Sequence, residues 1–150
     1  MAENGAKDRF HLARFVEAQA GVYEQVCAEL RAGRKRSHWM WFVFPQIRGL
    51  GSSEMAMRYA ISGREEALAY LEHSVLGPRL RECAGIVVGL EGRAGSGKTA
   101  SEIFGYPDDL KFHSSMTLFA EVEDPSERVF HEALKKYFGG KTDRKTLELM

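Results

Sequence analysis

Charge excess of either sign, cysteine and long hydrophobic runs are all scarce in this chain of 150 residues. Its 21 lysines and arginines balance its 21 aspartates and glutamates, so no overall field attracts nucleic acid or an anionic membrane. The longest uncharged stretch, residues 37–47, is far shorter than the ~20 residues that span a bilayer. Charged residues precede any apolar run at the N-terminus, so no signal peptide is predicted. The composition favours a cytoplasmic protein without membrane or nucleic-acid partners.

The two cysteines and five histidines follow no pattern of disulfides or metal ligands. Cys27 and Cys83 are isolated, without CxxC spacing, and are expected to be buried or inert thiols. No pair of histidines has the spacing of metal ligands. We therefore predict no metal site and no cofactor, and the composition leaves the oligomeric state open.

Apolar residues recur at steps of three and four through most of the chain. Over residues 12–30 this spacing predicts one long helix, which Gly33 ends. The solid apolar run at residues 37–45 fits a buried strand or a short buried helix equally well. A helix closed by Pro45 is favoured, because no partner strand is evident and proline disfavours helical geometry in the residue before it.

Several short polar sequences predict helix starts. The pairs Ser62 with Glu65 and Thr99 with Glu102 have the spacing of capping boxes. Asp108 is expected to cap a further helix, since aspartate is among the preferred N-cap residues. No segment alternates between apolar and polar residues with the period of two that strands require.

These signals predict an all-α fold with no substantial sheet. We expect one compact domain over residues 8–150, built from seven or eight short-to-medium helices, with a glycine-rich loop at 92–98. Residues 1–7 are expected to form a loose tail.

The glycine-rich loop matches the P-loop pattern G-x-x-x-x-G-K-T, which Gly97, Lys98 and Thr99 complete. A true P-loop needs a strand before it, whereas residues 80–90 fit a helical face better. We therefore favour a flexible loop between two helices, with Thr99 as a helix cap. A looser role, in which the loop holds a phosphate without hydrolysing a nucleotide, remains an alternative.

Two further groups of residues are candidates for a site. His38 lies between the basic residues 34–36 and the aromatic Trp39 and Trp41, which could form a pocket for an anion or serve only as core. Asp109 and His113 are four residues apart, a spacing that places a carboxylate and an imidazole on one helix face.

Several strings in the chain resemble the family called domain of unknown function 1810. They cover nearly the whole chain from about residue 10 to 147: His38-Trp-Met-Trp-Phe-Val-Phe-Pro-Gln46, Gly49-Leu-Gly51, Tyr59-Ala-Ile-Ser62, Leu76-Gly-Pro-Arg-Leu80, Ile103-Phe-Gly105, Pro107-Asp-Asp-Leu-Lys111 and Ser114-Ser-Met-Thr-Leu-Phe119. The resemblance implies a bacterial protein with an all-α fold, and it implies no established activity. It also implies that Gly95-Ser-Gly-Lys98 is a local insertion, which speaks against a family-wide NTPase.

The polar residues inside these strings motivate the functional hypothesis. We predict that the protein binds a small anionic or nucleotide-like ligand near the HWMWF and PDDLK segments, and we leave open whether it is an enzyme. The candidates are Arg79 and Lys111 for the anion, His38 or Asp109 for proton transfer, Gln46 and Ser114 for orientation, and Trp39 and Trp41 for the pocket walls. The alternatives are a non-catalytic protein-interaction module and, less favoured, a P-loop NTPase.

Overall fold

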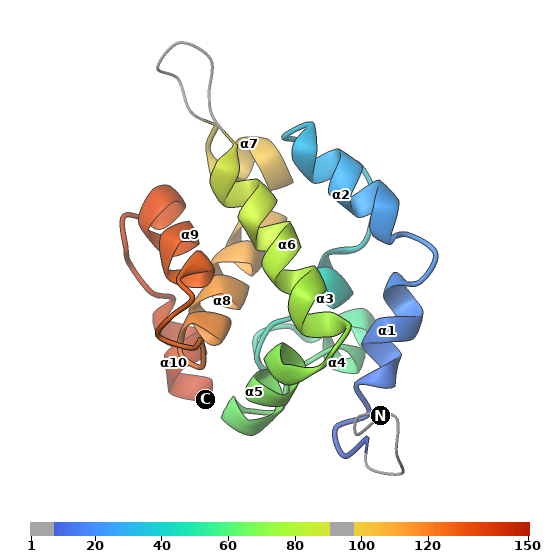
Figure 1. Cartoon of the computed structure of the whole chain (residues 1–150). Coiled ribbons are helices and arrows are strands. Elements are labelled where there is room, and N and C mark those ends of the chain that lie inside the picture. The colour runs from blue at the N-terminus through green and yellow to red at the C-terminus, as the bar shows by residue number, and fades with distance from the viewer. Residues whose placement is uncertain (1–7, 91–97) are drawn as a thin grey trace.

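The computed structural model describes residues 8–90 and 98–150, and in these ranges it holds ten α-helices and no β-strand (Figure 1). The helices are α1 (Ala13–Gln19), α2 (Tyr23–Arg31), α3 (Met40–Val43), α4 (Glu54–Arg58), α5 (Arg64–Glu72), α6 (Leu76–Gly89), α7 (Ala100–Phe104), α8 (Asp108–Ala120), α9 (Val129–Phe138) and α10 (Arg144–Leu149). The predicted all-α class is confirmed, although the helices in the described ranges exceed the seven or eight expected. The tail predicted at residues 1–7 and most of the loop at 92–98 lie outside the described residues.

The long helix predicted over residues 12–30 is two helices, α1 and α2, separated at residues 20–22. Gly21 lies in this break, where its low helix propensity weakens a continuous helix. Helix α1 packs against α3, whereas α2 packs against α6, so the two halves have different tertiary partners (Figure 1). Gly33 follows α2 with a φ of 75°, and the predicted end of the helical segment is confirmed.

The apolar run at residues 37–45 forms the short helix α3, which ends before Pro45 as predicted. Trp39 and Phe44, on either side of this helix, are fully buried. The Phe44 ring meets the Phe112 ring of α8 edge to face, with centroids 5.1 Å apart. This segment is therefore part of the core, and its packing fixes the position of the polar residues next to it in the chain.

Helix α8 lies at the centre of the core. Its residues 114–120 are all buried, and it packs against α5, α7, α9 and α10. A helix that is buried on all sides needs this cover from its neighbours. Helix α6, with 14 residues, contacts α2, α5 and α9 (Figure 1). No helix in the described part of the chain is long and apolar enough to cross a membrane.

One predicted capping box is confirmed and the other is wrong. The Thr99 hydroxyl accepts a hydrogen bond from the Glu102 amide at 3.1 Å, and the Glu102 carboxylate accepts one from the Thr99 amide at 2.8 Å. Ser62 donates its amide and its hydroxyl to Glu66 rather than to Glu65, each at 2.8 Å. The reason is that α5 starts one residue later than the predicted box requires, which places Glu66 at its third position.

Candidate functional site

The fold brings the start of α8 next to the basic and aromatic residues around α3. The Lys35 ammonium lies 2.8 Å from one oxygen of Asp108, and the Lys111 ammonium lies 3.5 Å from the other. Lys111 also lies 5.1 Å from the centre of the Trp41 ring. The expectation that Asp108 caps its helix is wrong, because α8 begins at Asp108 itself and the carboxylate is engaged by the two lysines.

Glu29 of α2 is the buried anchor of the loop between α2 and α3. Its carboxylate accepts hydrogen bonds from the Trp39 indole at 2.8 Å, the Ser37 hydroxyl at 2.6 Å and the Arg36 amide at 2.8 Å. The Gln25 side chain and the Ser37 amide are further donors. Burial raises the pKa of the Glu29 carboxyl, but these hydrogen bonds lower it more, to about 2. A charged Glu29 therefore holds the loop in place.

A polar hollow of about 520 Å³ lies beside this loop, between the end of α2 and α7. We call it the basic hollow, because Arg34, Lys35 and Lys98 line it, with Glu102 as the single acid among the described residues that line it. The Lys98 ammonium donates to the Gly33 carbonyl at 3.2 Å, which ties residue 98 to the loop after α2. Glu102 is itself engaged in the capping box of α7. Cations therefore outnumber acids around this hollow.

The P-loop pattern has a helix on each side of it in the structure. The residues before it belong to α6, which runs to Gly89, and the residues after Thr99 form α7. The Thr99 hydroxyl caps α7, and this predicted role is confirmed. Gly97 lies outside the described residues, whereas Lys98 is described and lines the basic hollow. A helix thus occupies the place where a P-loop needs a strand.

Arg79 and Gln46 lie away from the basic hollow. The Arg79 guanidinium is stacked over the Tyr23 ring, 4.8 Å from its centre, and donates to the Gln19 side chain at 3.3 Å. Gln46 is half-buried, and its backbone carbonyl accepts the Ile61 amide at 2.8 Å. Among the predicted anion ligands, only Lys111 therefore lies near the basic and aromatic segment.

Four other candidates on α8 and before α3 have different surroundings from one another. Ser114 is buried and donates its hydroxyl to Asp143 at 3.0 Å. The Asp109 carboxylate accepts the amide of the next residue at 2.9 Å, while the His113 ring stacks on Phe138 with centroids 4.1 Å apart. His38 is exposed to solvent. The catalytic roles suggested for His38 and Asp109 stay predictions.

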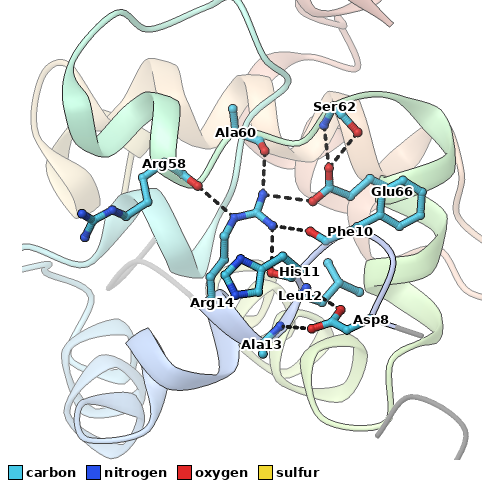
Figure 2. A network of polar contacts seen from close by, with 10 residues as sticks. All are labelled: Asp8, Phe10, His11, Leu12, Ala13, Arg14, Arg58, Ala60, Ser62 and Glu66. Carbon is cyan, nitrogen blue, oxygen red and sulfur yellow. Dashed lines mark hydrogen bonds and ion pairs between the residues drawn. The ribbon is translucent and has the colours of Figure 1, made fainter. Parts of the chain in front are cut away.

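Arg14 on α1 is the centre of a second polar network (Figure 2). Its side chain is 16% exposed, and all of its nitrogens donate hydrogen bonds. The acceptors are the carbonyls of Phe10 at 2.6 Å, His11 at 2.9 Å, Arg58 at 2.8 Å and Ala60 at 2.8 Å, and the carboxylate of Glu66 at 3.0 Å. This one guanidinium thus joins the chain before α1 to the end of α4 and the start of α5 (Figure 2).

A hollow of about 410 Å³ lies over the Arg14 network. We call it the arginine hollow, because Arg9, Arg48 and Arg58 line it in addition to Arg14. His11, which also lines it, has a φ of 54°, a left-handed conformation that is uncommon outside glycine. Sequence reasoning missed this hollow, because its arginines come from three distant segments and form no motif.

Residues 9–150 of the chain match the model of a family described as a protein of unknown function, DUF1810. Among solved structures, the chain is similar to the conserved hypothetical protein Rv1873 from Mycobacterium tuberculosis. The two are 59% identical, and the TM-score is 0.88 over 94% of this chain and 96% of the other. No curated protein matches the chain.

Proposed function

The chain belongs to the DUF1810 family of proteins of unknown function, as its sequence strings indicated, and we propose that it binds a small anionic ligand such as a nucleotide in the basic hollow. The observation that carries the proposal is the convergence of Arg34, Lys35 and Lys98 on one polar hollow. The chain as a whole has no net charge, so a local gathering of cations from residues 34–35 and 98 is not a consequence of composition.

The three cations have different surroundings, which gives them different roles. The Lys35 side chain is only 8% exposed and is held by Asp108, and Lys98 is held at the Gly33 carbonyl. The Arg34 guanidinium has no hydrogen bond or ion pair to any residue in the described ranges 8–90 and 98–150. Arg34 is therefore the group that can pair with a phosphate or carboxylate in two parallel hydrogen bonds, while the lysines supply fixed positive charge.

An aromatic side chain next to the hollow supports a ligand with a ring. Gly105 lines the hollow, and Tyr106 follows it in the chain with 80% of its surface exposed. An exposed aromatic ring offers a face on which a nucleobase stacks. Lys111 and Trp41 lie close by around Asp108, near the two segments in which the sequence predicted a pocket.

We assign binding rather than a reaction. The residues suggested for proton transfer, His38 and Asp109, are not among those that line the basic hollow. Their side chains would need to move toward a ligand in order to take part in chemistry, and a general acid or base must come within hydrogen-bond reach of the reacting atom.

The test is thermal unfolding against inorganic phosphate, ATP, ADP-ribose and benzoate. A ligand at about a hundred times its Kd should add roughly 2.7 kcal/mol to the stability, which raises Tm by several degrees. Arg34→Ala and Lys98→Ala should abolish the shift, whereas Arg36→Ala removes the same charge from an exposed position that does not line the hollow. Equal losses in all three variants, or no shift in the wild type, would contradict the proposal.

Exposed apolar side chains at the start of α8 favour a second candidate, a non-catalytic protein-interaction module. Tyr106 is 80% exposed and Leu110 is 52% exposed, and the two side chains are only four residues apart. A photo-crosslinking residue at position 106 should then capture a partner in the native host. A crosslinker at Leu68, which is 42% exposed on α5, is the matched control and should capture nothing specific.

A further inference from the structure

We propose that the arginine hollow is a second, separate site, and that it binds the phosphate group of a small phosphorylated molecule. The hollow lies at the junction of the chain before α1, the residues after α3 and the end of α4. None of its residues lines the basic hollow, so the two proposals rest on different parts of the chain.

The balance of charge in the hollow favours an anion with more than one negative charge. Four arginines line it, and Glu66, the single carboxylate that lines it within residues 8–90 and 98–150, is already paired with Arg14 at 3.0 Å. Arg9 reaches Glu65 at 3.2 Å, but both side chains are more than two-thirds exposed, so this pair is weak and exchanges readily with solvent or a ligand. Three guanidinium groups are therefore left for a ligand, which suits a phosphate dianion better than a single carboxylate.

Arg48 and Arg58 are the groups that we expect to bind the phosphate. Both side chains are exposed, and neither guanidinium has a hydrogen bond or ion pair to any residue within 8–90 and 98–150. In Figure 2 the Arg58 carbonyl faces Arg14 while its side chain extends away from that network. Planar guanidinium groups bind phosphate oxygens in bidentate fashion and keep their charge at all relevant pH values.

Arg14 acts as a positioning residue and not as a ligand. Its donors are all used within the protein, so it has none to offer to a phosphate. It fixes the backbone at Phe10 and His11 on one side and at Arg58 on the other (Figure 2). The segment that carries Arg58 is therefore held before any ligand arrives, which lowers the entropic cost of binding.

The volume and lining of the hollow are compatible with a small molecule. Its volume of about 410 Å³ falls in the range typical of small-molecule sites. Phe10 and Met57 contribute apolar surface beside the arginines, and Ser62 contributes a hydroxyl. A phosphate ester with a compact organic part would place its charge on the arginines and its carbon skeleton on this apolar wall.

The experiment measures the binding of inorganic phosphate by calorimetry in the full-length Arg34→Ala/Lys98→Ala variant, in which the basic hollow is disabled. Saturable binding that remains there belongs to another site. Adding Arg48→Ala or Arg58→Ala should weaken it by about tenfold or more, since each removes a charge-assisted hydrogen bond. Arg128→Ala, at an exposed arginine before α9, is the matched control and should leave the Kd unchanged.

The outcomes separate the two proposals and the source of the phosphate. Absence of saturable binding in the Arg34→Ala/Lys98→Ala variant, or equal weakening by Arg128→Ala, overturns the second site and leaves the basic hollow untouched. Sedimentation with phosphatidylcholine vesicles that contain phosphatidic acid tests the source. Binding to these vesicles that is lost in Arg48→Ala assigns the phosphate to a lipid headgroup, and phosphate binding without vesicle binding assigns it to a soluble molecule.

Discussion

The basic hollow and the arginine hollow are each built beside a buried glutamate, but the negative charges of the two glutamates are stabilised in different ways. Glu29, beside the basic hollow, accepts hydrogen bonds from an indole, a hydroxyl, an amide side chain and two backbone amides. No cationic side chain in the described part of the chain pairs with it. Glu66, beside the arginine hollow, pairs directly with the buried guanidinium of Arg14.

This difference predicts which change should disrupt the structure around each hollow. Uncharged donors from the loop between α2 and α3 stabilise the charge of Glu29, so the carboxylate and the loop depend on each other. At Glu66 a single cation balances the charge and also holds four carbonyls from separate segments. The basic hollow should therefore respond to pH through one carboxyl, and the arginine hollow should depend on one side chain.

The largest effect is expected from Arg14→Ala. Its loss leaves the Glu66 carboxylate buried without its cation and leaves the carbonyls of Phe10, Arg58 and Ala60 without the guanidinium donor, so the free energy of unfolding should fall by about 3–5 kcal/mol. Urea unfolding followed by circular dichroism measures this.

Arg9→Ala is the matched control for Arg14→Ala, because Arg9 pairs with Glu65 at the surface with both side chains more than two-thirds exposed. We expect a loss of about 0–1 kcal/mol. If the two arginine variants cost the same, the Arg14 network is not the structural centre of its hollow.

A smaller and pH-dependent effect is expected from Glu29→Gln. The pKa of Glu29 is lowered from 4.5 to about 2 in the folded protein, so the charged carboxylate stabilises the fold by roughly 3 kcal/mol relative to a neutral one. This stability is fully present above the unfolded pKa of 4.5 and is lost as the pH falls toward 2.

The prediction for Glu29 is therefore a difference between wild type and Glu29→Gln that is large at pH 7 and shrinks as the pH falls from about 4.5 to 2. Urea titrations across this range measure it. Glu24→Gln, at an exposed position on the same helix, should show no such trend. A constant difference at every pH would show that Glu29 acts through shape and not through charge.

The smallest effect is expected from Thr99→Ala, which removes the cap of α7 beside the basic hollow. We expect a loss of about 1 kcal/mol in the free energy of unfolding, because the Glu102 amide at the start of the helix loses its side-chain acceptor. Thr99→Ser keeps the hydroxyl and should restore the stability. Phosphate binding in the arginine hollow should not change in either variant. That result would show that the arginine hollow does not depend on the structure around the basic hollow.

Local patterns in the sequence predicted most of the helices but not all of their limits. The capping box at Thr99 was correct, because both of its partners lie within one turn. The helix over residues 12–30 was predicted as continuous, since its apolar spacing hardly changes at Gly21. Gly21 is a local signal for the break, but only the structure shows that the two halves pack on different helices, α3 and α6.

The candidate sites depended still more on contacts between distant residues. Lys111 and Trp41 were named from the sequence and do meet, but Arg79 and Ser114 were named for the same site and lie with other partners. Lys98 was noticed as part of a P-loop pattern, and the structure places it in a hollow with residues 34 and 35 instead.

By itself, the sequence determined the all-α class, the family and the positions of most helices. These follow from spacings of three or four residues and from strings within single segments, which are local properties of a chain. Only the tertiary structure decided that Arg34 and Lys98 line one hollow and that Arg9, Arg14, Arg48 and Arg58 line another. Such groupings arise when helices pack side against side, and packing joins residues that no spacing along the chain relates.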